Sequence, residues 1–392
     1  MRTYERTFQW LKFSLDLREA PASLWINLGQ CQTRCEDIQG INLPPEIASH
    51  LERLFLAKGC SATTAIEGNT LTEQEVLAHL DGKLDLPPSR QYLAQEISNI
   101  LAGCNWIREI IPDLAAGKAT LDPALVKRLN ALALDGLILE ENVVPGEVRR
   151  HEKLVFRYRP APAEDCEFLL ERLCDWINRK TFTPPAGMTI VYALIKAVVT
   201  HLYLAWIHPF GDGNGRTARL VENLVLLQAG VPAPAAQLLS LHYHLTRSEY
   251  FRQLDQATRS GGEVEPFLVY AFQGFRDGLG LLLDEIRARQ AEVLWQAHVH
   301  ETFRRKGGPG AERQLRLALD LAAAPKPVPL LELPTLSPHL AQTYAGKSAK
   351  TLSRDAQALV ELGLAEKTDS GFRARREIVS AFRPIEPGPI WT

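Results

Sequence analysis

HPFGDGNGRTAR, residues 208–219, lies between two apolar segments, VYALIKAVVTHLYLAWI before it and LVENLVLLQAG after it. The apolar residues of both segments recur with the three- to four-residue spacing of a helix. The glycines between them interrupt this spacing, as expected for a loop. The stretch therefore predicts two helices joined by a glycine-rich loop, and the second helix begins near Arg216.

The glycines and arginines of the loop predict an anion site. Glycine adopts backbone conformations that other residues avoid, so Gly211, Gly213 and Gly215 let neighbouring N–H groups turn toward one point. A helix N-terminus adds further N–H groups and a favourable dipole. Arg216 and Arg219 are three residues apart and share one helix face, from which both guanidinium groups can bind phosphate oxygens. A polyphosphate is the expected ligand.

Two more side chains of the loop add chemistry to this site. Asp212 provides a hard carboxylate, which suits Mg²⁺ because proteins usually hold this ion with one or two carboxylates and substrate phosphates. His208 stands at the start of the loop, and an imidazole with an ordinary pKa of about 6.5 suits a general base. We therefore expect Asp212 to be the metal ligand and His208 the catalytic base.

The loop resembles the motif that defines the Fic family, H-P-F-x-D/E-G-N-G-R-x-x-R, and matches it at every specified position. Residues 146–160 are similar to the family's β-hairpin flap, and residues 246–267 to the helices after the motif. The resemblance covers roughly residues 50 to 280. It implies a helical enzyme that transfers AMP from ATP to a Tyr, Thr or Ser hydroxyl of a target protein, releasing pyrophosphate.

The resemblance also implies a role for each residue that matches the motif. His208 would deprotonate the target hydroxyl, and Asp212 would hold Mg²⁺ between the α- and β-phosphates. Asn214, with nearby backbone N–H groups, would stabilise the charge that develops on the α-phosphate. Arg216 and Arg219 would hold the β- and γ-phosphates.

Further nucleotide-binding residues are expected around this centre. The flap presents strand edges that could align an extended segment of the target. The additional expected residues are Lys153, Leu154, Val155 and Phe156 of the flap, Gly211, Gly213, Gly215, Thr217 and Ala218 of the loop and helix start, and Tyr250, Phe251 and Thr258 around the adenine. For the last three, ordinary helix packing is an equally good interpretation.

An upstream segment, SATTAIEGN at residues 61–69, fits the Fic inhibitory pattern S/T-x-x-x-E-G/N from Thr63 to Gly68. Thr63 and Glu67 are four residues apart and would share a helix face, so the hydroxyl would help fix the helix while the carboxylate reaches Arg219. An arginine so engaged cannot hold the γ-phosphate, and low resting activity is expected. In some relatives this glutamate is thought to activate water for AMP removal, which leaves a second role for Glu67 open.

The remaining pattern predicts a mainly α protein with a short β-hairpin flap and a C-terminal winged-helix domain. Helical periodicity dominates from Pro45 onward, and the clearest break is KGGPG at residues 306–310. Three helical patterns and a hairpin about Asp369-Ser370-Gly371 follow the break. The expected domains are an N-terminal helical region, 1–110, with the inhibitory helix at about 61–69, a Fic core, 111–305, and a winged helix, 306–392.

Basic residues in this last domain leave its partner open. Lys347, Lys350 and Arg354 recur at helical spacing at the start of the third helix, where a recognition helix would meet DNA. A protein-interaction or dimerisation module with a solvated basic face is an equally good interpretation. One alternative function is therefore a DNA-binding regulator whose Fic domain senses nucleotides. Another is a Fic enzyme that transfers a different group, although Gly213, Arg216 and Arg219 disfavour phosphate transfer.

Composition and charge limit the possible partners and location of the protein but do not decide among the functions above. The chain has 392 residues with 44 basic and 46 acidic side chains, so no whole-protein field selects a partner. We expect no secretory signal and no apolar run long enough to span a membrane, and hence a cytoplasmic protein. The six cysteines lack a C-x-x-C pair and are expected to be reduced and mostly buried. The expected partners are a target protein and, as candidates, DNA or a second copy of the chain.

Overall fold

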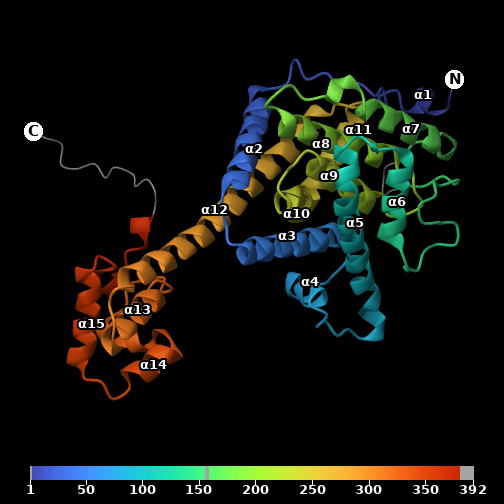
Figure 1. Ribbon diagram of the computed structural model, residues 1–392. Helices are drawn as coiled ribbons and strands as arrows, with labels where there is room; N and C mark the ends of the chain where they lie inside the picture. Colours follow the sequence, from blue (N-terminus) through green and yellow to red (C-terminus); the bar gives the residue numbers. More distant parts are fainter. Residues whose placement is uncertain (1, 155–158, 380–392) are drawn as a thin grey trace, which may run out of the picture. The chain divides into compact units, whose positions relative to one another are not determined.

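The computed structural model describes residues 2–154 and 159–379, and it confirms a mainly α-helical protein (Figure 1). The described residues contain fifteen α-helices, six short 3₁₀-helices and one two-stranded sheet. The helices up to the loop are α1 Tyr4–Thr7, α2 Ala22–Gly40, α3 Pro45–Ile66, α4 Glu73–Leu80, α5 Gln91–Ala115, α6 Pro123–Leu134, α7 Cys166–Ile177 and α8 Thr189–Ile207. The later elements are α9 Asn214–Gln228, α10 Leu238–Leu245, α11 Arg247–Arg259, α12 Glu265–Phe303, α13 Pro309–Leu321, α14 Pro338–Tyr344, α15 Ala349–Glu361, β1 Ala365–Thr368 and β2 Gly371–Ala374.

The chain divides into two compact units, one ending at Asp284 and one beginning at Glu285. The division falls inside α12, so the first part of this long helix belongs to one unit and the second part to the other. The break expected at residues 306–310 is the short connection between the end of α12 and the start of α13.

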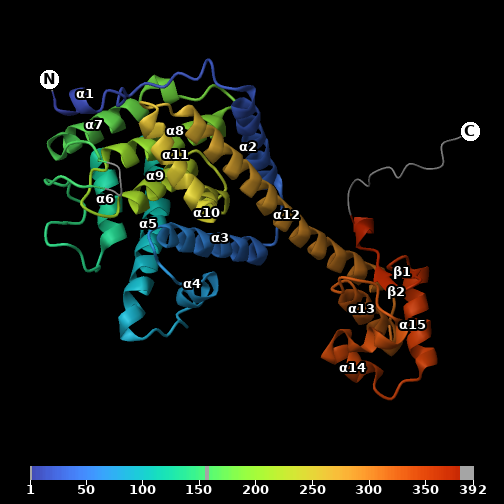
Figure 2. The same cartoon turned by 180° about the vertical axis from the view of Figure 1, so that it is seen from behind.

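Helix α8 forms the centre of the first unit, where it packs against α9, α2 and α7 (Figures 1 and 2). Helix α9 in turn packs against α5 and α6. The side chains of α8 are buried almost along its whole length, because neighbouring helices surround it and leave no face for water. The loop between α8 and α9 is thus held by the two most enclosed helices of the unit.

The hydropathy of α8 corrects one expectation from the sequence. Thr189–Ile207 has a mean hydropathy of 1.8 and is long and apolar enough to cross a membrane by length and composition. However, 83% of this window is buried inside the protein, as in the core helix of a folded domain. The expectation that no run reaches this length was wrong because Lys196 and His201 do not lower the average enough.

The region of the expected flap shows no paired strands in its described parts, residues 146–154 and 159–162. A single antiparallel bridge joins Val148 to Phe210, with the Arg149 N–H donating to the Pro209 carbonyl at 2.9 Å. This bridge ties the start of the region to the loop. The tip, with Val155 and Phe156, lies outside the described residues, so the hairpin itself stays a prediction.

The second unit contains α13, α14 and α15, followed by the antiparallel pair β1 and β2 (Figure 2). Outside this sheet, Val328 forms one isolated antiparallel bridge with Phe372 of β2. Asp355 of α15 is buried beneath these elements and accepts hydrogen bonds from Arg313 at 3.0 Å, Gln314 at 3.0 Å and Tyr344 at 3.2 Å. This buried carboxylate therefore connects α15 to α13 and α14.

The cysteines agree with the sequence interpretation. All six lie within the described residues, and each is a free, buried thiol. Burial raises the pKa of Cys174 to about 12, because a thiolate loses its hydration inside the protein. They are packing residues of the helical core.

Candidate active site

The loop at the centre of the first unit is bounded by two left-handed residues. His208 ends α8 with φ 50°, and Gly213 precedes α9 with φ 74°. Glycine takes this conformation at little cost, whereas it is uncommon for a residue with a side chain. His208 is thus held in a strained conformation at the mouth of the loop, which is a frequent property of functional residues.

Side-chain amides and a guanidinium hold the loop in this shape. Asn214 accepts a hydrogen bond from the Phe210 N–H and donates one to the Phe210 carbonyl, both at 2.9 Å. Asn130 of α6 donates to the Asp212 carbonyl at 2.9 Å. Arg149, which is buried, donates from Nε to the His208 carbonyl at 2.8 Å. The backbone of the loop is therefore fixed before any ligand arrives.

The first turn of α9 leaves backbone N–H groups without an acceptor inside the helix. Its N-cap residue, Gly213, has no side chain to accept from the first turn, and the first helical bond runs from Thr217 N–H to the Gly213 carbonyl at 2.8 Å. The N–H groups of residues 214–216 therefore have no intrahelical acceptor. An anion is the natural partner for such N–H groups.

Arg219 lies in this space and is only 2% exposed. Its Nη2 donates to the Glu67 carboxylate at 2.6 Å and to the Thr63 carbonyl at 3.0 Å. Its Nε and Nη1 have no hydrogen-bond acceptor among the described residues. A buried guanidinium with unused donors is costly unless a further acceptor binds it, so Arg219 is prepared for an additional anionic ligand.

Arg216 is held differently. It is 5% exposed and pairs with Glu96 of α5 at 3.2 Å and with Asp212 at 3.3 Å. Glu96 also accepts a hydrogen bond from Asn69 at 2.8 Å. Both arginines are thus connected to the segment that ends α3, one directly through Glu67 and one through Glu96 and Asn69.

Glu67 is the C-cap residue of α3, and its carboxylate enters the loop. A Cβ added to Gly215 would collide with the Glu67 carboxylate and crowd the Arg219 guanidinium. The carboxylate therefore lies against the N-terminus of α9, where an incoming phosphate would have to bind. Burial raises the pKa of Glu67, but the Arg219 charge outweighs burial and the pKa is lowered overall. Glu67 is accordingly ionised at neutral pH.

The predicted contact between Glu67 and Arg219 is present, but Thr63 contributes differently than expected. Arg219 binds the Thr63 main-chain carbonyl. The hydroxyl that bonds within α3 belongs to Thr64, which donates to the Cys60 carbonyl at 3.0 Å. The main chain of α3 therefore takes part in the contact directly.

His208 is neutral in this environment. Burial lowers the pKa of its imidazole to about 3, and the positive charges of Arg149 and Lys153 act in the same direction. A neutral imidazole keeps a lone pair that can accept a proton. His208 thus has the protonation state that a general base needs at neutral pH.

Asp212 presents a carboxylate that is 48% exposed at the edge of the loop. One oxygen accepts from the Gly213 N–H at 2.6 Å, and the other faces Arg216. A single accessible carboxylate beside an anion site fits Mg²⁺, which binds few protein ligands and completes its shell with phosphates and water. The described residues contain no cluster of three or more metal-ligating side chains.

The remaining predicted site residues are placed as follows. Lys153 donates from Nζ to the Gly211 carbonyl, and Leu154 is 66% exposed. Thr217 and Ala218 are buried in α9, and the Thr217 hydroxyl donates to the Gly213 carbonyl at 2.8 Å. The buried side chains of Thr217 and Ala218 therefore support the loop, and only the main chains of these two residues can reach a ligand.

The three residues expected around the adenine lie on α11. Tyr250 is buried, and its hydroxyl lies 2.8 Å from His201 Nε2. Thr258 accepts a hydrogen bond from the Trp206 indole at 3.0 Å, and Phe251 lies beneath the Arg247 guanidinium. Their adenine-binding role stays a prediction.

Sequence reasoning missed polar residues outside the loop. Glu96, Asn130 and Arg149 contact Arg216 or the loop backbone, and His201 and Glu222 lie side by side, both buried, on α8 and α9. His201 and Glu222 could have been singled out from the sequence, because each interrupts a run of apolar residues and therefore needs a buried partner. The others sit in ordinary amphipathic or polar surroundings, and no local pattern distinguishes them.

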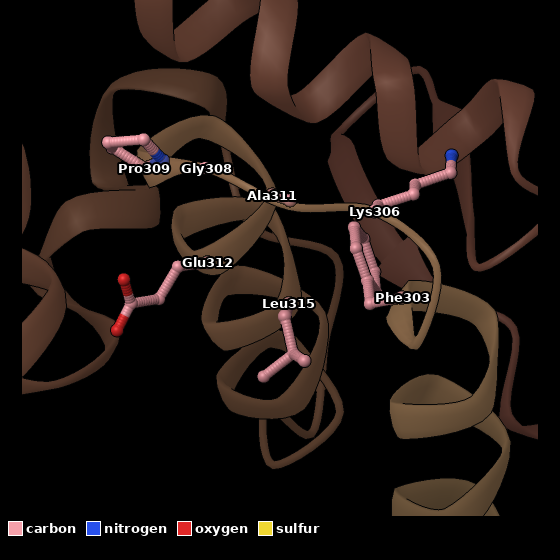
Figure 3. Close-up of a pocket in the computed structure, with 7 residues that line it drawn as sticks. All are labelled: Phe303, Lys306, Gly308, Pro309, Ala311, Glu312 and Leu315. Carbon is pink, nitrogen blue, oxygen red and sulfur yellow. The ribbon is translucent and has the colours of Figure 1, made fainter.

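The cavities found in the second unit lie apart from this chemistry. Figure 3 shows one of about 390 Å³ at the junction of α12 and α13. Its lining residues are Phe303, Lys306, Gly308, Pro309, Ala311, Glu312 and Leu315. Another, of about 470 Å³, runs along the exposed face of α15. Neither brings together a nucleophile, a base and an anion site.

The first unit is thus a helical domain built around a preformed loop at the N-terminus of α9, and known proteins resemble it. Residues 120–226 match the Fic/DOC family profile. The chain is 28% identical over 209 residues to protein adenylyltransferase fic-1 of Caenorhabditis elegans, covering 53% of this chain and 37% of that protein. It is 26% identical over 214 residues to protein adenylyltransferase Fic of Nematostella vectensis, covering 53% and 44%. The chain spans about two fifths of the length of these curated relatives.

Solved structures agree on the fold. A Fic family protein from Desulfovibrio desulfuricans aligns with a TM-score of 0.52 and 22% identity, over 89% of this chain and 92% of that one. Fic-1 from C. elegans aligns with a TM-score of 0.53 and 20% identity, over 68% of this chain and 73% of that one. Residues 120–226 therefore resemble a Fic domain, and the chain shares the fold of these Fic proteins.

Proposed function

We propose that the chain is a protein adenylyltransferase, which transfers AMP from ATP to a Tyr, Thr or Ser hydroxyl of a target protein and is held inactive by Glu67. The observation that supports this most strongly is the arrangement at the start of α9. A neutral His208, an uncapped helix N-terminus and a buried Arg219 with unused donors converge on one loop. The names of the curated relatives support the same activity.

The chemistry divides among the residues of this loop. The target hydroxyl oxygen attacks the α-phosphorus and its proton passes to His208, while the bond to the β-phosphate oxygen breaks and pyrophosphate leaves. N–H groups of residues 214–216 lie where the negative charge of the α-phosphate increases. Arg216 and Arg219 hold the β- and γ-phosphates through charge-assisted hydrogen bonds.

A divalent cation fits this scheme at one residue. Asp212 would hold Mg²⁺ through its half-exposed carboxylate. The ion would neutralise charge between the α- and β-phosphates. Asn214 takes a positioning role, because its side-chain amide is used to fix the Phe210 backbone.

Glu67 restrains this activity by occupying the place of a phosphate. Its carboxylate pairs with Arg219 at 2.6 Å and lies against Gly215. A triphosphate that cannot reach Arg219 binds with its α-phosphate misplaced, and misplacement of about 1 Å can lower a rate roughly a hundredfold. Release of Glu67 would both vacate the site and free a donor on Arg219.

The replacement Glu67→Gly tests the activity and the restraint together. We expect roughly a hundredfold more incorporation of label from ATP labelled at the α-phosphate, both into the chain and into proteins of a lysate. Intact mass should show the addition of AMP, and Glu67→Gly with His208→Ala should show none. Addition of a phosphate or of another nucleotide would contradict the transferred group. Label loss that requires Glu67 would instead favour AMP removal.

A second candidate function concerns the second unit alone. We propose that it is a winged helix that binds duplex DNA through α15. Lys347, just before α15, and Lys350 and Arg354 on it are exposed and have no ion-pair partner among the described residues. By contrast, Arg373 of the hairpin pairs with Glu366 at 2.7 Å. Duplex DNA binding that weakens with salt, retained by the full-length His208→Ala chain, would support it. Absence of binding at low salt would exclude it and favour a protein partner.

A further inference from the structure

Arg216 is held between two carboxylates that differ in how firmly they are fixed. Its Nη1 donates to Glu96 Oε1 at 3.2 Å, and its Nη2 donates to Asp212 Oδ2 at 3.3 Å. The Arg216 side chain is 6% exposed, that of Glu96 18% and that of Asp212 48%. Glu96 lies on α5, whereas Asp212 belongs to the loop before α9. Arg216 therefore has one enclosed partner from a helix and one half-exposed partner from the loop.

The enclosed partner is fixed by Asn69, which is itself buried. The Asn69 amide nitrogen donates to the other Glu96 oxygen, Oε2, at 2.8 Å and to the Leu93 carbonyl at 2.9 Å. The Asn69 amide oxygen accepts a hydrogen bond from the Leu71 N–H at 3.0 Å. These contacts allow the amide one orientation, because turning it over would place oxygen against oxygen and N–H against N–H. Each Glu96 oxygen thus has its own partner, and the carboxylate is kept against Arg216.

The half-exposed partner is the one that a divalent cation would take. In the proposed function Asp212 holds Mg²⁺, and a carboxylate that shares its charge with a metal ion attracts a guanidinium less strongly. Arg216 Nη2 is then released for a phosphate oxygen. Arg216 Nε has no acceptor among the described residues and is a further unused donor. Of the two carboxylates, Glu96 is then the one that still holds Arg216.

We propose that Glu96 is a positioning residue that holds Arg216 for the β- and γ-phosphates of ATP, and that Asn69 keeps Glu96 in place. The inference rests on the proposed function, in which Arg216 binds the same phosphates. The physical gain is preorganisation, because a long side chain that is already fixed loses less conformational freedom when a ligand binds. The charge of Glu96 by itself repels a triphosphate. A net benefit of Glu96 to ATP binding is therefore a sign of positioning.

Glu109 provides a matched control on the same helix. It is exposed on α5 and has no ion-pair partner among the described residues, and it lies about 20 Å further along the helix than Glu96. Glu96→Gln and Glu109→Gln each remove one negative charge from α5 and keep the size of the side chain. The amide in Glu96→Gln can still bind Asn69, but the charge that faces Arg216 is lost.

The test measures binding of Mg-ATP and of AMP by calorimetry, in full-length chains that carry Glu67→Gly so that Arg219 is released. We expect Glu96→Gln to weaken Mg-ATP binding about tenfold, and AMP binding by less than about twofold, because AMP lacks the phosphates that Arg216 holds. Asn69→Ala should act in the same direction with a smaller effect, and Glu109→Gln should change neither affinity. In chains that also carry Arg216→Ala, Glu96→Gln should no longer weaken Mg-ATP binding.

Each contrary result bears on a different claim. Unchanged or tighter Mg-ATP binding by Glu96→Gln would overturn the positioning role, and tighter binding would mean that Glu96 competes with the phosphates for Arg216. Equal weakening of ATP and AMP binding, or a loss that persists without Arg216, would mean that Glu96 only supports the fold. If Glu67→Gly protein shows the expected binding pattern but transfers no AMP, the proposed activity fails and the positioning role stands. If that protein binds no Mg-ATP, both fail.

Discussion

Two regions of this protein gather arginines, and they differ in what surrounds the charge. Arg219 in the first unit is buried and pairs with the carboxylate of Glu67. Arg354 in the second unit is exposed on α15. A buried guanidinium must be matched by fixed acceptors and selects a ligand by geometry. An exposed one remains hydrated and attracts any polyanion in a salt-dependent way.

The largest expected effect is a difference in kcat/KM between alanine variants of the two arginines. In a Glu67→Gly chain, Arg219→Ala is expected to lower kcat/KM for ATP by about a hundredfold or more, because a preorganised donor to the phosphates is lost. Arg354→Ala in the same chain should leave kcat/KM unchanged. Steady-state transfer to a fixed acceptor, measured for both, makes the comparison. A similar loss with Arg354→Ala would show that the second unit takes part in catalysis.

The next largest effect is on stability, and it compares the loss of a buried ion pair with the loss of an exposed one inside the second unit. Asp355→Ala leaves Arg313 and Tyr344 without their shared acceptor and should cost about 3–5 kcal/mol of unfolding free energy. Arg373→Ala breaks a surface pair with Glu366 and should cost about 0–1 kcal/mol. Denaturant unfolding of the full chain gives both values. Equal costs would mean that Asp355 does not hold the three helices together.

A smaller effect sharpens the role of the exposed face of α15. If this face contacts DNA phosphates, Lys350→Ala and Arg354→Ala should each reduce the slope of log affinity against log salt by about one. Fluorescence anisotropy with a labelled duplex at several salt concentrations measures that slope. Arg373→Ala, whose charge is already paired, serves as the control. Unchanged slopes in all three variants would place any DNA contact elsewhere.

The smallest expected effect is an absence of pH dependence. The pKa of His208 is lowered to about 3 by burial and by neighbouring positive charges, so the base form is complete well above that value. A Glu67→Gly chain should therefore show no change in kcat/KM between about pH 5 and pH 8 from this group. In the intact chain the lowered pKa of Glu67 keeps its pair with Arg219 ionised over the same range. A fall in rate centred near pH 6.5 would contradict the burial of His208.

Some of these features could be read from the sequence because they are local. The glycine spacing predicted the loop, and the arginine spacing predicted two guanidinium groups at the start of α9. The inhibitory pattern even predicted the contact of Glu67 with Arg219, which the structure shows at 2.6 Å. The hairpin flap was drawn from equally local signals, but its described parts contain no paired strands.

Other features depend on residues that are far apart in the chain. Arg216 takes Glu96 as a partner from α5, and the loop backbone is held by Asn130 of α6 and by Arg149. A polar residue in a helical pattern predicts only that it needs a partner. Which partner it finds is set by how the helices pack, and local spacing does not contain that information.

The sequence by itself determined the class of the protein, a helical chain with a Fic loop and an upstream glutamate, because each of these is written in consecutive or closely spaced residues. Only the tertiary structure decided how the charges of the site are balanced. Burial removes water as a partner, so every buried donor and acceptor must find another across the core. That requirement brings Glu67 against α9 and places the buried His201 of α8 beside Glu222 of α9.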